Sequence, residues 1–116
     1  MANICDNRVK IYPKETMDTF PEGLGKKIKK FFEDEDNDER YNVLMDMYHV
    51  DTDDEYYIEI EGSSKWNVRA EEWSKLAQKW QVNILITGVE EEIGFVQVVR
   101  AYADGQLENE ELDTSM

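Results

Sequence analysis

The sequence predicts an α+β domain, and three patterns in it favour that class. Apolar residues recur at helical spacing in 21–33 and again in 70–80. Residues 56–61 (YYIEIE) alternate apolar and polar side chains, as a strand with one buried face does. Two further apolar runs, 82–87 and 93–102, are typical of strands. The full order of predicted elements is β-α-β-β-α-β-β, and its first six elements match the ferredoxin-like split βαβ pattern. We therefore expect a ferredoxin-like sandwich: an antiparallel sheet of four to five strands with two helices on one face.

The first half of the chain supplies a strand, a helix and one ambiguous segment. Residues 4–12 alternate loosely and then meet Pro13, which predicts a first strand. The helix predicted over 21–33 carries apolar residues at i, i+4 and i+7 from Leu24, with four lysines off that stripe. Residues 41–50 (YNVLMDMYHV) suit a strand that pairs with 56–61, although their leucine and methionine also suit a helix.

The second half supplies the best-defined helix and a closing hairpin. The small residues 62–64 (GSS) are expected to break the preceding strand, and Asn67 to cap the next helix. The two strands after that helix are expected to form a hairpin connected by 88–92. The predicted buried stripe of the helix comprises Ala70, Trp73, Leu76, Ala77 and Trp80.

The length and composition predict one domain with a modest core. The chain has 116 residues, of which 41% are apolar and 11% aromatic, so wholesale disorder is not expected. We assign residues 1–103 to a single ferredoxin-like domain. Residues 104–116 are acidic and lack periodicity, so they are expected to form a flexible tail.

The charge balance excludes several classes of partner. The chain has 27 acidic and 13 basic residues, a formal net charge of -14 at pH 7. Such a surface repels nucleic acid and anionic membranes and attracts basic surfaces. No apolar run approaches the roughly 20 residues of a membrane span. Cys5 is the single cysteine, so no internal disulfide can form, and a cytoplasmic location is expected.

The acidic runs do not match metal-binding motifs. Two of them begin like calcium-binding loops, at Asp34 and at Asp51, with acids at alternate positions. Position 6, where the sharp turn needs glycine, holds Glu39 in one run and Tyr56 in the other. Position 12, where a glutamate is needed, holds methionine in one and glycine in the other. We therefore expect no metal site and interpret both runs as solvated loops.

The sequence also argues against catalysis. The single histidine, His49, lies in a segment expected to be a strand, and nothing marks it as a base beside Cys5 or a serine. The glycines at 23 and 25 lack the spacing of a phosphate-binding loop. We therefore expect no enzyme activity and no cofactor.

Parts of the chain resemble a known protein family. Residues 1–12 open with the string Met-Ala-Asn-Ile-Cys-Asp-Asn-Arg, which is similar to the start of a small bacteriophage and prophage family. Residues 58–105 also resemble that family, with a Ser-Lys-Trp stretch at 64–66 and a Glu-Ile-Gly-Phe stretch at 92–95. The family usually has prolines where this chain has Asn-Val-Arg at 67–69. The resemblance implies a ferredoxin-like fold and a phage-type origin. It carries over no catalytic residue.

These observations lead to two hypotheses of function. In the first, the protein binds a host protein with a basic nucleic-acid-binding surface, such as a defence protein, and blocks it. Carboxylates spread over a folded surface can imitate the charge of DNA, and a phage-encoded protein would act in the host cytoplasm. In the second, the protein is an adaptor that uses the open sheet face or an edge strand, and its acidity serves solubility only. The residues expected to bind the partner are Asp34, Glu35, Asp36, Asp38, Glu39, Asp51, Asp53, Asp54, Glu90, Glu91 and Glu92.

Overall fold

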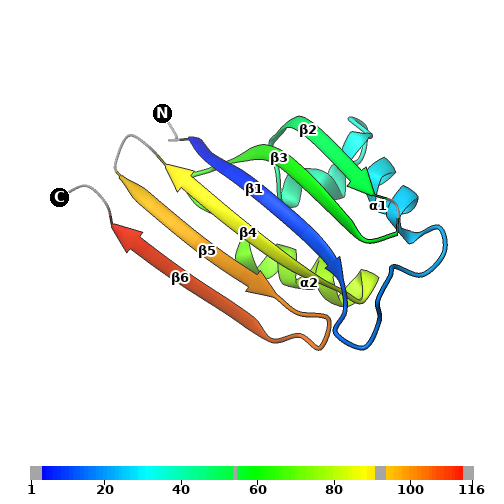
Figure 1. Cartoon of the computed structure of the whole chain (residues 1–116). Coiled ribbons are helices and arrows are strands. Elements are labelled where there is room, and N and C mark those ends of the chain that lie inside the picture. Colours follow the sequence, from blue (N-terminus) through cyan, green and yellow to red (C-terminus); the bar gives the residue numbers. More distant parts are fainter. Residues whose placement is uncertain (1–3, 54, 91–93, 114–116) are drawn as a thin grey trace.

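The computed structural model describes residues 4–53, 55–90 and 94–113 and has an α+β architecture (Figure 1). Within those residues one antiparallel sheet of six strands is accompanied by two α-helices and a short 3-10 helix. The elements are β1 (Ile4–Pro13), α1 (Leu24–Glu33), η1 (Asp38–Asn42), β2 (Asp46–Asp53), β3 (Tyr57–Lys65), α2 (Ala70–Trp80), β4 (Val82–Glu90), β5 (Phe95–Ala101) and β6 (Leu107–Asp113).

The sheet has the strand order β2-β3-β1-β4-β5-β6. β3 lies between β1 and β2, so the first β-α-β unit is split by the strand that follows it. β4 pairs with the other side of β1, and β5 and β6 continue the sheet as an antiparallel meander (Figure 1). The described sheet thus has six strands rather than the expected four to five.

The sixth strand comes from the segment that we expected to be a tail. Leu107–Asp113 pairs with β5, and the connecting turn is closed by the N–H of Tyr102, which donates to the Gln106 carbonyl at 3.0 Å. Gly105 has a φ of 93° in this turn, a conformation that favours glycine. The strand shows no apolar alternation because its described side chains are exposed on both faces. Backbone pairing, and not a buried face, therefore forms this strand.

Both helices pack on the same face of the sheet. Along β1 every second residue is buried, starting at Cys5, and the residues between them are exposed. The helices meet through their aromatic rings: Phe32 stacks on Trp73 at 5.7 Å between centroids, and Phe31 meets Trp80 edge-on at 4.9 Å. Aromatic pairs of this kind contribute about 0.5–1.5 kcal/mol beyond their buried area. The predicted stripe of α2 is confirmed, with Ala70 partly buried and its other four residues buried.

Several element boundaries differ from the expectation, for physical reasons. β3 continues through 62–64, because Gly62 lets β2 approach: a Cβ there would lie 2.5 Å from the Asp46 carbonyl oxygen. Asn67 does not cap α2, which begins after Arg69; its carbonyl instead accepts a 2.6 Å hydrogen bond from Ser64 Oγ. The ambiguous segment 41–50 contains the end of η1 and the first half of β2.

Candidate functional site: the acidic loop and the sheet edges

The acidic loop, residues 34–39, runs from the end of α1 into the first two residues of η1. Its five carboxylate side chains, Asp34, Glu35, Asp36, Asp38 and Glu39, are all exposed. Hydrogen bonds to its backbone hold the loop in one conformation. The N–H of Asp36 donates to Asp34 Oδ1 at 3.0 Å, and the N–H of Glu39 donates to Asn37 Oδ1 at 3.1 Å.

Three residues tie the acidic loop to the folded body. Arg40 is buried and donates from Nη1 to the Phe32 carbonyl at 3.1 Å, at the last turn of α1. The Tyr41 hydroxyl donates to the Glu35 carbonyl at 3.0 Å. Lys79 of α2 lies 3.1 Å from Glu39 Oε2. These contacts leave the carboxylates of Glu35, Asp36 and Asp38 facing solvent, so the loop presents negative charge from a fixed backbone.

The second predicted acidic run lies at the other end of α1. Asp51 is exposed on β2 opposite Glu59 of β3, and Asp53 ends that strand opposite Tyr57. The turn after it is anchored by the N–H of Phe20, which donates to the Glu55 carbonyl at 2.7 Å just before α1. Since α1 has 10 residues, about 15 Å of helix separates its two ends. The structure therefore does not merge the two runs into one patch.

The third predicted acidic run, residues 90–92, contributes no exposed carboxylate among the described residues. Glu90 at the end of β4 is 1% exposed, so its carboxylate is not available to a partner, contrary to the expectation. It lies on the helix-side face of the sheet, where β-strand alternation buries every second residue. Asp54, Glu91 and Glu92 lie outside the described residues.

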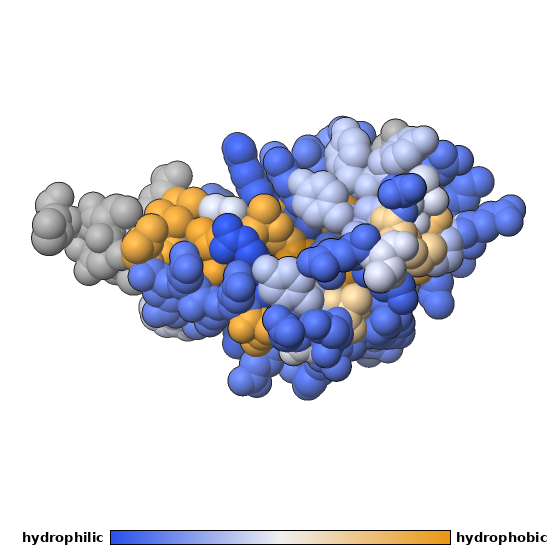
Figure 2. All heavy atoms as spheres, turned by 60° about the horizontal axis from the view of Figure 1, so that its bottom comes forward, coloured by the Kyte–Doolittle hydropathy of each residue, from blue (hydrophilic) through white to orange (hydrophobic). Residues whose placement is uncertain are grey.

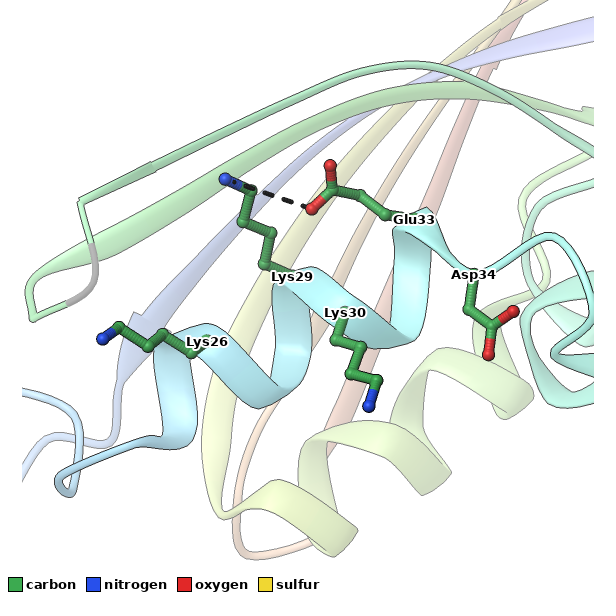
Figure 3. A pocket seen from close by; sticks show the side chains of 5 residues that line it. All are labelled: Lys26, Lys29, Lys30, Glu33 and Asp34. Carbon is green, nitrogen blue, oxygen red and sulfur yellow. Dashed lines mark ion pairs between the residues drawn. The ribbon is translucent and has the colours of Figure 1, made fainter.

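The lysines of α1 form no convergent anion site. A shallow hollow on the outer side of the helix is lined by Lys26, Lys29, Lys30, Glu33 and Asp34 (Figure 3). Lys29 and Glu33 point toward each other at 4.0 Å, whereas Lys30 and Asp34 point to the other side of the helix (Figure 3). The positive charges thus diverge and lie next to carboxylates.

A second, polar hollow of about 520 Å³ lies beside the β5–β6 turn. Several of its polar groups already have partners: Gln81 Nε2 donates to the Ala103 carbonyl at 3.0 Å, and the Ala103 N–H donates to Asn83 Oδ1 at 3.1 Å. The Tyr102 hydroxyl donates to Glu108 Oε2 at 3.3 Å. These contacts hold the turn against the end of α2.

The groups considered for catalysis lie apart. Burial raises the pKa of the Cys5 thiol from 9.0 to about 11, and this outweighs a hydrogen bond with Ser64 that lowers it. The thiol is therefore protonated at neutral pH and a poor nucleophile. His49 is exposed on β2, opposite Glu61. Among the residues that the structure describes, no three His, Cys, Asp or Glu side chains cluster in a way that could hold a metal ion.

Neither described helix has the length and apolarity to cross a membrane.

Sequence reasoning missed two surface features. One is β6, an edge strand that carries Glu108, Glu110 and Glu111. The other is Trp66, which is 52% exposed. Its φ of 69° is an unusual backbone conformation for a bulky residue. The hydrogen bond from the Val68 N–H to Gln97 Oε1, at 2.9 Å, fixes the loop that holds this tryptophan. The only sequence signal for this exposed tryptophan is an aromatic residue that closely follows the small residues 62–64.

Comparisons with protein-family models, with curated proteins and with solved structures return no match for this chain. The bacteriophage resemblance therefore stays a prediction.

Proposed function

We propose that this protein is a non-enzymatic binding protein that covers a basic, nucleic-acid-binding surface of another protein. The observation that carries the proposal is the acidic loop, whose exposed carboxylates project from a backbone fixed by Arg40 and Asn37. Because the backbone that carries these charges is already ordered, binding an opposite surface costs less conformational freedom than ordering a flexible loop would. A net charge of -14 would steer association with a basic protein.

The proposed partner is a host defence or nucleic-acid-handling protein, in line with the phage-type resemblance, and the proposed compartment is the host cytoplasm. Duplex DNA carries about one charge per 1.7 Å of axis, and the carboxylates of the acidic loop offer a local imitation of that field.

We also propose that β1 to β4 and the two helices form a ferredoxin-like core. The split β-α-β order and the packing of both helices on one face support this assignment.

The experiment is affinity capture from a bacterial lysate at about 0.1 M and about 0.5 M salt, with duplex DNA as competitor. The test variant is Glu35→Gln/Asp36→Asn/Asp38→Asn, which leaves the backbone bonds of the loop in place. The control is Glu15→Gln/Asp18→Asn/Glu22→Gln, which removes the same charge from the exposed segment before α1.

We expect a nucleic-acid-binding protein that is captured at low salt, displaced by duplex DNA, lost with the loop variant and kept with the control. Equal loss with both variants would mean that only net charge matters. A partner that survives both high salt and DNA would contradict the proposal and favour an apolar contact on the sheet.

A further inference from the structure

β6 is a straight edge strand with a complete ladder on one side. Its residues pair in unbroken register with β5, from Leu107 opposite Ala101 to Asp113 opposite Phe95. β6 is the last strand in the sheet order, so no described strand pairs with its outer side. In an antiparallel ladder the outward N–H and C=O groups of such a strand are a template for a further strand.

The opposite edge of the sheet is less suited to this role. β2 has a register shift between Met47 and His49, where a bulge or similar irregularity interrupts the ladder with β3. Bulges twist an edge and limit the pairing of another strand. Of the two edges, β6 is therefore the one with regular strand geometry.

The side chains of β6 define the chemistry of a matching strand. Register with β5 places Glu108 beside Arg100 and Glu110 beside Val98, on the face of the sheet away from the helices. Glu111 lies on the other face, opposite Gln97. Leu112 is 59% exposed. Figure 2, which brings the β6 side of the molecule forward, shows apolar surface next to hydrophilic side chains.

A second copy of the chain is a poor occupant of this edge. Pairing β6 with another β6 would bring glutamates against glutamates, and like charges directly opposite one another are destabilising in a sheet. An extended segment with lysine or arginine at alternate positions would instead place cations opposite Glu108 and Glu110, which share one face of the sheet. Each such cross-strand pair contributes roughly 0.2–1 kcal/mol.

We propose that the outer edge of β6 binds an extended, basic segment of another protein, in which lysine or arginine alternates with apolar residues. The segment adds a strand to the sheet: backbone hydrogen bonds supply affinity, and the carboxylates select for positive charge. This surface is separate from the acidic loop, so the proposal stands or falls independently of the proposed function.

The test uses a ten-residue peptide of alternating lysine and valine, and the same peptide with N-methyl groups on every second backbone amide. N-methylation keeps the charge and removes donors along one strand edge. We expect the plain peptide to bind, to slow hydrogen exchange of β6 amides, and to bind at least about tenfold more tightly than the methylated peptide, which corresponds to about 1.4 kcal/mol.

Charge-reversal variants locate the peptide on the molecule. Glu108→Lys/Glu110→Lys should weaken binding about tenfold or more, whereas Glu35→Lys/Asp38→Lys in the acidic loop makes the same change of charge and should have little effect. Because Glu108 contacts Arg100 and Tyr102, the single variant Glu110→Lys guards against a loss of folding. Three results would overturn the proposal: equal binding of both peptides, an effect of the loop variant alone, or no binding. If neither peptide binds, the carboxylates of β6 would instead serve to prevent edge pairing.

Discussion

Cys5 shows how the fold changes the chemistry of a single side chain. It is fully buried on β1, and its thiol pKa of about 11 exceeds the ordinary value of 9.0 because burial disfavours the thiolate. At pH 10 an unfolded chain ionises this thiol and the folded chain does not. The native state therefore holds a proton that the unfolded state releases.

This difference makes stability fall with pH in alkaline solution. The contribution of Cys5 is fully present below pH 9 and is lost as pH rises through about 11. Relative to Cys5→Ala, wild type should lose up to about 2.7 kcal/mol of unfolding free energy over that range. Urea denaturation of both proteins at pH 8, 9, 10 and 11 measures the difference. Parallel curves for the two proteins would show that the thiol ionises equally in both states.

At the scale of elements, β6 is joined to the core by one buried polar residue. Gln97 on β5 is 1% exposed; its Nε2 donates to Asn109 Oδ1 at 2.9 Å, and its Oε1 accepts from the Val68 N–H. The side chain thus links β6 to the loop before α2. Removing β6 would leave this amide without its partner on that strand.

Truncation after Tyr102 tests whether β6 belongs to the folded domain. We expect a loss of about 2 kcal/mol or more of unfolding free energy, because a buried hydrogen bond and a strand pairing disappear together. We also expect self-association, since β5 becomes the edge and carries three valines. Urea denaturation and light scattering measure both effects, and Asn109→Ala isolates the hydrogen bond. An unchanged midpoint would support the flexible tail that the sequence predicts.

The sequence predicted the elements whose apolar pattern reports burial. The α2 stripe is readable because Trp73 and Trp80 face the sheet and α1 at helical spacing. β6 is not readable, because a strand solvated on both faces has no alternation to detect. The glycine and serines of 62–64 resemble a loop, and only the close approach of β2 makes them a strand. The acidity of the 34–39 loop is visible in the sequence, whereas its fixed shape depends on the buried Arg40, a tertiary contact without a local signal.

At the scale of the whole molecule, the exposed charges are poorly balanced. Ion pairs such as Arg8–Glu61 and Lys10–Glu59, both at 3.9 Å, are solvent-exposed, and pairs of this kind contribute about 0–1 kcal/mol each. The chain still carries a net charge of -14, and this excess of negative charge repels itself in the folded state.

Salt should therefore stabilise this protein. Raising sodium chloride from about 0.05 M to about 0.5 M shortens the Debye length and should raise the unfolding free energy by about 1 kcal/mol. Thermal unfolding at both salt concentrations measures the shift. The Glu35→Gln/Asp36→Asn/Asp38→Asn variant carries less charge and should show a smaller shift. A decrease in stability with salt would mean that the ion pairs outweigh the repulsion.

The placement of the three tryptophans has a practical consequence. Trp73 and Trp80 are 0% and 5% exposed in the core, whereas Trp66 is 52% exposed beside Lys65. The intrinsic fluorescence therefore combines a blue-shifted emission from the interior with a red-shifted emission from one surface loop. An aqueous quencher such as acrylamide would quench the emission of Trp66 before that of Trp73 and Trp80. Ligand binding near the loop and unfolding of the core thus have separate optical signatures in the unlabelled protein.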